Sequence, residues 1–128
     1  MISGGAVLLP VVSGKMIREV AKLIPLDKLM WSLGSHFNKH GRTMGYASKA
    51  DYDAAAKAFA TDMQTKPNTI IIEGEWNGAG QLNGTTQRAI INDGTTVIVD
   101  SKTGQVIDFY EGTELKGLIN QRQVKIKD

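Results

Sequence analysis

Residues 15–37 place apolar side chains at helical spacing in two segments. In residues 15–24 the apolar side chains share one side, and Pro25 ends the pattern because proline cannot continue a helix. In residues 26–37 apolar side chains again recur every three or four positions. Gly41 follows, where a left-handed C-terminal cap would need glycine. The pattern therefore predicts two successive helices.

A third helix is predicted over residues 48–66, where apolar side chains keep the same spacing. Ser48 is followed three positions later by Asp51, an arrangement that resembles a capping box with Asp in place of Glu. Pro67 disfavours helical backbone at the residue before it, so we expect the helix to end there.

Beyond Pro67 the pattern becomes that of β-strands. β-Branched side chains are frequent, and Gly and Asn mark turns between the runs. Asp93-Gly94 is a strong signal for a tight hairpin. The last run alternates apolar residues with lysines, as in an edge strand that discourages further pairing. The predicted strands are residues 69–73, 88–92, 95–100, 105–110 and 123–127.

Helices followed by consecutive hairpins predict an α+β domain, with N-terminal helices packed on one face of a twisted antiparallel β-sheet. The chain of 128 residues suffices for one such domain, which we expect at residues 26–128. Residues 1–25 are interpreted as a separate apolar, helical segment. It lacks the basic leader of a signal peptide, and proline and polar residues interrupt it, so we expect no stable membrane span.

The composition removes several kinds of chemistry. The chain has no cysteine, which excludes disulfides, thiol nucleophiles and Cys-based zinc sites. Its net charge is only +2, but residues 1–66 hold nine Lys/Arg and five Asp/Glu, whereas residues 67–128 hold six and eight. The basic first half contains both histidines, which favours a polyanionic ligand.

His36 and His40 are the only histidines, and imidazole is the side chain that titrates near neutral pH without help. On a helical wheel His40 falls on the apolar stripe and His36 at its edge, so we expect both to face the sheet or a groove beside it. Two other interpretations remain open. Both imidazoles can be structural, or they can share a metal ion, although the Glu of a His-Glu-x-x-His motif is missing.

Lys39 and Arg42 bracket His40 and bring cations to the imidazoles. Metal-free cleavage of RNA needs a base for the 2′-hydroxyl, an acid for the leaving oxygen and cations for the developing negative charge. Two histidines with Lys39 and Arg42 would supply all three. The alternative for these cations is a solvated helix end, where positive charge suits the helix dipole.

The predicted strands add further candidates, because Asp108 and Tyr110 share one face of their strand. Trp31 and Trp76 offer surfaces on which bases can stack, with packing as their alternative role. No metal ligand set and no cofactor motif is identified. The candidate catalytic residues are His36, His40, Arg88, Thr96, Asp108 and Tyr110, and the candidate substrate-binding residues are Lys39, Arg42, Thr95 and Thr113.

The segment His-Phe-Asn-Lys-His-Gly at residues 36–41, with the later Gly45, Ser48 and residues 52–56, resembles a known family. It is similar to the C-terminal toxin domains of bacterial polymorphic toxins, which include contact-dependent growth inhibition toxins. Residues 88–110 resemble the hairpin region of the same domains. Nuclease members of this group have the barnase/EndoU/colicin/RelE fold and often cleave tRNA.

The resemblance implies a metal-independent ribonuclease that needs no cofactor. It implies a cell-surface effector delivered into the cytoplasm of a neighbouring bacterium, with tRNA as substrate. A cognate immunity protein and an activating factor of the target cell would be its protein partners. Residues 1–25 would then be the end of an entry region.

The same resemblance carries His36 and His40 over as catalytic residues, with His40 the better match. Many relatives have Thr or Ser in the last strand where Asp108 stands here, so a hydroxyl would have to come from Thr95, Thr96 or Thr113. Two other functions stay open. One is a toxin of another nuclease class, such as a metal-dependent DNase, and the other is a non-enzymatic binding module with structural histidines.

Overall fold

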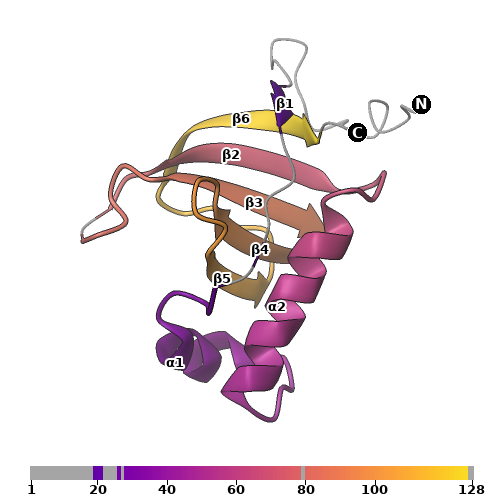
Figure 1. Ribbon diagram of the computed structural model, residues 1–128, viewed down its shortest axis with the longest axis vertical. Helices are drawn as coiled ribbons and strands as arrows, with labels where there is room; N and C mark the ends of the chain where they lie inside the picture. Colours follow the sequence, from indigo (N-terminus) through magenta and orange to yellow (C-terminus); the bar gives the residue numbers. More distant parts are fainter. Residues whose placement is uncertain (1–18, 22–25, 27, 79, 127–128) are drawn as a thin grey trace.

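The computed structural model describes residues 19–21, 26, 28–78 and 80–126, which form two helices and a twisted six-stranded sheet (Figure 1). The strand order is β1-β6-β2-β3-β4-β5. The strand β1 pairs parallel to β6, and all other neighbours are antiparallel. Helices against an antiparallel sheet confirm the α+β expectation. The strands are β1 (Glu19–Ala21), β2 (Ile70–Trp76), β3 (Thr86–Asn92), β4 (Thr95–Asp100), β5 (Val106–Glu111) and β6 (Leu118–Ile126).

Helix α2 (Lys49–Met63) covers one face of the sheet and supplies much of the core. It begins as predicted, because the Ser48 hydroxyl accepts a hydrogen bond from the Asp51 backbone N–H at 3.1 Å. Its buried residues are Tyr52, Asp53, Ala56 and Ala60, and the two alanines are small enough to bring the helix close to β4 and β5. Tyr52 reaches furthest, and its hydroxyl donates to the Phe109 carbonyl. Fully burying one of the apolar side chains beneath it stabilises the fold by about 1.5–3 kcal/mol.

The first four of the five predicted strands are all present, as β2 to β5. Asp93 and Gly94 join β3 to β4 with positive φ angles of 51° and 77°, the backbone of a two-residue hairpin turn. This local signal sets the register in which Asn92 lies opposite Thr95.

Strand β5 contains a β-bulge that matters for the site. Ile98 of β4 pairs with Asp108, but Val99 pairs with Val106, so Ile107 is an extra residue on β5. Because a bulge turns two successive side chains to the same face, Ile107 and Asp108 both point away from α2. Val106 and Phe109, on either side of the bulge, stay in the core.

The second predicted helix is mostly wrong. Only Leu33–His36 is α-helical (α1), and it continues as a π-helix, η2 (Phe37–Gly41). Upstream of α1, tertiary hydrogen bonds replace helical ones: Met30 N–H donates to the buried Asp53 carboxylate and Trp31 N–H to the Val106 carbonyl, both at 2.8 Å. The expected apolar stripe is broken with it, since the Leu29 side chain is 66% exposed.

The expected role of Gly41 is also wrong. It lies inside η2, where an added Cβ would come within 2.5 Å of the Phe37 ring and 3.0 Å of the Tyr52 ring. Gly45, with φ of 94°, is the residue that takes the left-handed conformation after this helix. Gly41 is therefore required for close packing rather than for capping.

Two predictions near the ends of the chain need correction. Residues 19–21 form strand β1 instead of part of a helix, and the rest of the helix predicted at 15–24 lies outside the described residues, as does most of the segment 1–25. Strand β6 is longer than predicted and lies between β1 and β2, so it is not an edge strand. Within the described ranges, no helix is long and apolar enough to cross a membrane.

Candidate functional site

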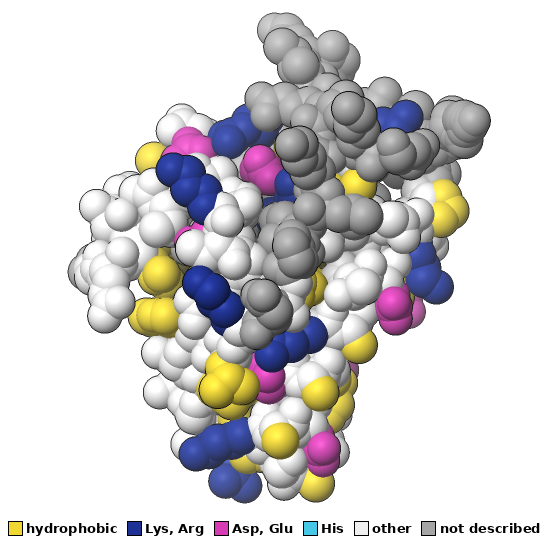
Figure 2. All heavy atoms as spheres, in the orientation of Figure 1, with side chains coloured by type: hydrophobic (Ala, Val, Ile, Leu, Met, Phe, Trp, Pro, Cys, Tyr) yellow, Lys and Arg dark blue, Asp and Glu magenta, His cyan; other side chains and the backbone are white. Residues whose placement is uncertain are grey.

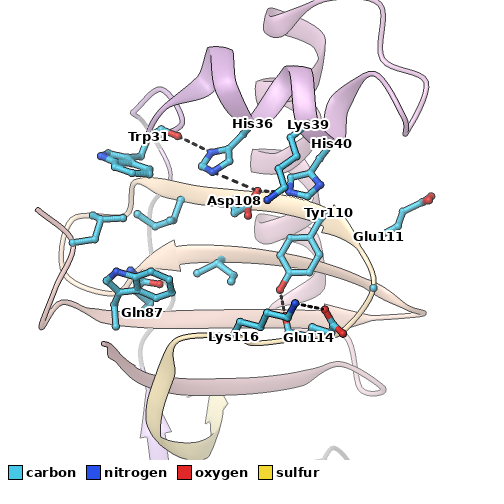
Figure 3. A pocket seen from close by; sticks show the side chains of 15 residues that line it. Trp31, His36, Lys39, His40, Gln87, Asp108, Tyr110, Glu111, Glu114 and Lys116 are labelled. Carbon is cyan, nitrogen blue, oxygen red and sulfur yellow. Dashed lines mark hydrogen bonds and ion pairs between the residues drawn. The ribbon is translucent and has the colours of Figure 1, made fainter. Parts of the chain in front are cut away.

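A pocket of about 680 Å³ lies on the sheet face opposite α2 (Figure 3). Strand alternation explains its floor: Val97 and Phe109 face the α2 core, so Ile98, Asp108 and Tyr110 face the other way. The face that α2 covers shows no histidine among the described residues (Figure 2). The pocket is walled by α1 and η2 on one side and by the β2–β3 and β5–β6 connections on the other.

Both imidazoles of the chain converge on one carboxylate in this pocket. His36 Nε2 lies 3.9 Å and His40 Nε2 lies 3.7 Å from Asp108 Oδ1 (Figure 3). These separations exceed a direct hydrogen bond, so the attraction is electrostatic and neither nitrogen is blocked by the carboxylate. The two rings lie 6.4 Å apart and nearly parallel, because four positions across the α1–η2 junction return to the same side.

The ring of His36 is oriented by backbone. Its Nδ1 lies 2.9 Å from the Trp31 carbonyl oxygen, so Nδ1 carries a hydrogen and donates it. Trp31 is itself tied to the edge of β5 through its N–H bond to the Val106 carbonyl. This chain of contacts leaves Nε2 of His36 as the nitrogen that faces Asp108 and the pocket.

His40 is tuned towards its neutral form. Burial lowers the pKa of His40 from its ordinary value of 6.5, and the positive charges of Lys39 and His36 lower it further. The Asp108 carboxylate opposes these effects but does not reverse them. Near neutral pH, therefore, His40 holds an unprotonated nitrogen that can accept a proton.

Tyr110 closes the pocket beside His40, with the two ring centroids 5.5 Å apart. Its hydroxyl donates to the Glu114 carbonyl in the β5–β6 connection. Burial, with a smaller effect from the Asp108 charge, raises the pKa of Tyr110 to about 12. The phenol is therefore neutral under ordinary conditions and serves as a hydrogen-bonding group.

Five of the ten predicted site residues lie together in the pocket. They are His36, Lys39, His40, Asp108 and Tyr110. Arg88 does not: it is buried on the α2 face, where it donates to Glu73 Oε2 and Gln64 Oε1, each at 2.8 Å. Strand alternation is the reason, since on β3 it is Gln87 that faces the pocket.

Four further predicted residues also lie outside the pocket lining. Arg42 donates to the Asn38 side chain and its guanidinium covers the Phe37 ring at 4.9 Å. Thr96 is fully buried, and its hydroxyl donates to the Gly112 carbonyl at 2.7 Å. Thr95 and Thr113 are not among the lining residues, so no threonine hydroxyl reaches the imidazoles in the described part of the chain.

Other lining residues were missed or placed in a minor role by the sequence. Trp31 and Trp76, known only as possible stacking surfaces, both line the pocket. Gln87 and Lys116 were not singled out at all. Gln87 pairs with Asp100 in the hairpin that turns at Asp93-Gly94. Counting residues back from this turn would have given the pairing, and with it the face of β3 on which Gln87 lies.

Across the described residues, no group of three or more His, Asp or Glu side chains has an arrangement that could hold a metal ion.

Comparison with known proteins gives no further guide to the site. No family model, no curated protein and no solved structure matches this chain.

Proposed function

We propose that this protein is a metal-independent endoribonuclease that acts on tRNA. One observation carries the proposal: two imidazoles converge on a single carboxylate, at 3.9 and 3.7 Å, in a pocket that also contains a lysine. Two-step acid–base chemistry on a phosphodiester needs two proton-transfer groups on one site, and His36 and His40 are the only imidazoles in the chain.

His40 is assigned as the base, because its lowered pKa keeps it unprotonated at neutral pH. It takes the proton of a ribose 2′-hydroxyl, whose oxygen then bonds to the adjacent phosphorus. His36 is assigned as the acid. Its Nδ1–H is held by the Trp31 carbonyl, so its Nε2 is the nitrogen that faces Asp108 and the pocket. It gives a proton to the departing 5′-oxygen, and the products are a 2′,3′-cyclic phosphate and a free 5′-hydroxyl.

The remaining pocket residues support this step. Lys39 lies between the two histidines in sequence and lines the pocket, where its ammonium offsets the negative charge that develops on the phosphate oxygens. Asp108 holds both imidazoles and balances the charge of whichever is protonated. Tyr110 packs against the His40 ring and limits its movement.

The resemblance to contact-dependent growth inhibition toxins supports a biological setting for this activity. The domain would be delivered from the surface of one bacterium into the cytoplasm of another. A cognate immunity protein would neutralise it in the producing cell, and an activating factor of the target cell would assist it. The more basic first half of the chain, which supplies both histidines, suits an RNA substrate.

The direct test is incubation of the protein with total tRNA in EDTA, followed by analysis of the RNA ends. We expect cleavage with 2′,3′-cyclic phosphate ends, and a loss of about 10²–10⁴-fold in rate for His40→Ala, as expected for a general base. Absence of cleavage by the wild type, equal cleavage by the variant, or activity only with added divalent metal would each reject the proposal.

A matched pair of lysine and arginine variants tests the pocket itself. Lys39→Ala removes a cation that lines the pocket, whereas Arg42→Ala removes one that covers Phe37 outside it, three positions along the same segment. We expect the first to slow cleavage and the second to leave the rate close to that of the wild type. Equal losses would mean that general positive charge, and not the pocket, drives binding.

A further inference from the structure

Beside the histidines, the pocket continues into an apolar part. Its lining there is aromatic and aliphatic, with Trp31, Trp76 and Leu82 around the side and Ile98 and Ile107 on the floor. In Figure 3, Trp31 and Gln87 lie on one side of the pocket, and Tyr110, Glu114 and Lys116 on the other. The acid–base residues therefore stand between a charged rim and an apolar hollow.

Two glycines pack closely against the indole of Trp76 and fix its position in this hollow. A Cβ on Gly117 would lie 2.3 Å from Cζ3 of Trp76, and a Cβ on Gly78 would lie 2.7 Å from Cζ2, nearer the indole nitrogen. Both glycines are thus held close against the ring, which the backbone bonds Asn77 N–H to Gly117 O and Gly84 N–H to Trp76 O also support. Trp76 is half-buried and fixed, so its pocket side is a preformed flat surface.

Gln87 adds a polar group whose orientation is determined. The side chain is only 2% exposed, yet it lines the pocket. The Thr85 hydroxyl donates to the Leu82 carbonyl at 2.6 Å, so its oxygen is left to accept from Gln87 Nε2 at 3.2 Å. The amide oxygen of Gln87 has no hydrogen-bond partner within the described part of the protein. The fully buried unpaired side-chain atoms of the described residues belong to Gln123, so this oxygen of Gln87 is accessible from the pocket and can accept an N–H group of a ligand.

We propose that this hollow binds a nucleobase of the RNA, next to the phosphate that the histidines act on. The base stacks on the Trp76 indole, with Trp31 as the opposite wall, and donates an N–H from its edge to Gln87 Oε1. A base is favoured over other apolar groups because it combines a flat π face with edge N–H donors, and the hollow presents aromatic rings with one fixed acceptor. This inference rests on the proposed ribonuclease function, for which it names the feature that selects the cleaved nucleotide.

The protein carries its own probe for this binding. Trp31 and Trp76 are its only tryptophans and both line the pocket, so intrinsic fluorescence reports on that pocket alone. The experiment titrates the full chain with each of the four nucleoside 3′-monophosphates and, separately, with inorganic phosphate. We expect saturable fluorescence changes, one base bound more tightly than the others, and much weaker binding of phosphate. Equal binding of phosphate and all four nucleotides, or no saturable change, would overturn the subsite.

Variants separate stacking from hydrogen bonding. Trp76→Leu keeps an apolar side chain and should weaken nucleotide binding about tenfold, the order expected for loss of one base–aromatic stack. Gln87→Met keeps the length of the side chain and should make the four nucleotides bind alike. Leu29→Ala is the control, because this exposed side chain lies outside the pocket lining and should change neither result. Wild-type affinities in both pocket variants would overturn the proposal.

Loss of fold is controlled by thermal unfolding of each variant, with Trp76→Phe as a milder replacement that should retain most binding. The base preference is then compared with the sequences cleaved in a random RNA library. Nucleotide binding without any RNA cleavage would reject the ribonuclease function and keep the subsite. Cleavage with the same base preference in Gln87→Met as in the wild type would reject the subsite and keep the ribonuclease.

Discussion

Two charged clusters lie on opposite faces of the same sheet, and they differ in how tightly their members are joined. On the α2 face, Arg88 contacts Glu73 at 2.8 Å, and their side chains are only 4% and 11% exposed. On the pocket face, Asp108 Oδ1 lies 3.7 Å from His40 Nε2 and 3.9 Å from His36 Nε2, and the three side chains are between 16% and 23% exposed. We call the first, Arg88 with Glu73, the closed cluster, and the second, Asp108 with His36 and His40, the open cluster.

The closed cluster joins elements of the fold, whereas the open cluster has the properties of a reactive site. Arg88 also bonds Gln64 at the end of α2, and Arg122 approaches Glu73 at 4.0 Å, so the closed cluster joins β2, β3, β6 and the helix. None of its members lines the pocket. In the open cluster the Nε2 atoms of both imidazoles face Asp108 without a direct hydrogen bond to it. Burial lowers the pKa of His40 there. Reactive groups need this combination of partial burial and incomplete pairing.

The largest expected effect comes from breaking the closed cluster. Arg88→Met leaves the buried Glu73 carboxylate with only the more distant Arg122, 4.0 Å away, as a cationic partner, and we expect the free energy of unfolding to fall by about 3 kcal/mol. Urea denaturation measures it. The double variant Arg88→Met/Glu73→Gln should recover part of the loss, because no buried charge remains. A loss below about 1 kcal/mol for the single variant would show that the two clusters do not differ in kind.

The next effect concerns the open cluster, where Asp108→Asn should alter chemistry more than stability. The carboxylate raises the pKa of His40 against the effects of burial, so its removal lowers that pKa further. The acid limb of the pH–rate profile should then move to lower pH. The rate at neutral pH should fall about 10- to 100-fold, a part of what acid–base catalysis supplies. An unchanged acid limb would mean that His40 does not govern it.

A smaller effect is expected at Tyr110. Tyr110→Phe removes the hydroxyl that donates to the Glu114 carbonyl, and we expect the free energy of unfolding to fall by about 0.5–1.5 kcal/mol. The pH–rate profile should keep its shape, because the phenol, with its pKa raised to about 12, does not titrate in the range of the assay. A lost basic limb in the variant would instead make Tyr110 a proton donor in the reaction.

The smallest effect is the pH dependence of stability due to His40. Its pKa is lower in the folded protein than the ordinary 6.5, so the unfolded chain takes up the proton first as the pH falls. This contribution to stability is therefore full above about pH 6.5 and is lost progressively below it, down to the folded-state pKa. His40→Gln should reduce the slope of unfolding free energy against pH in that window. A slope equal to that of the wild type would contradict the lowered pKa.

Much of the fold was readable because its signals are local. The Ser48 cap and the turn at Asp93-Gly94 are each made by a few neighbouring residues, and both were predicted correctly. The helix expected at residues 26–37 failed because Met30 and Trp31 bond to residues far along the chain, Asp53 and Val106. No pattern of apolar spacing contains those partners.

The site divides in the same way. By itself the sequence identified the candidate acid–base residues His36 and His40, the cation Lys39, and the shared face of Asp108 and Tyr110, because each depends on residue type or on short-range periodicity. Only the tertiary structure decided that Asp108 meets both imidazoles, because α1 and η2 pack beside β5. It also decided that Arg88 belongs to the opposite face, because the side of a sheet that a charge occupies depends on strand pairing, a contact between distant segments.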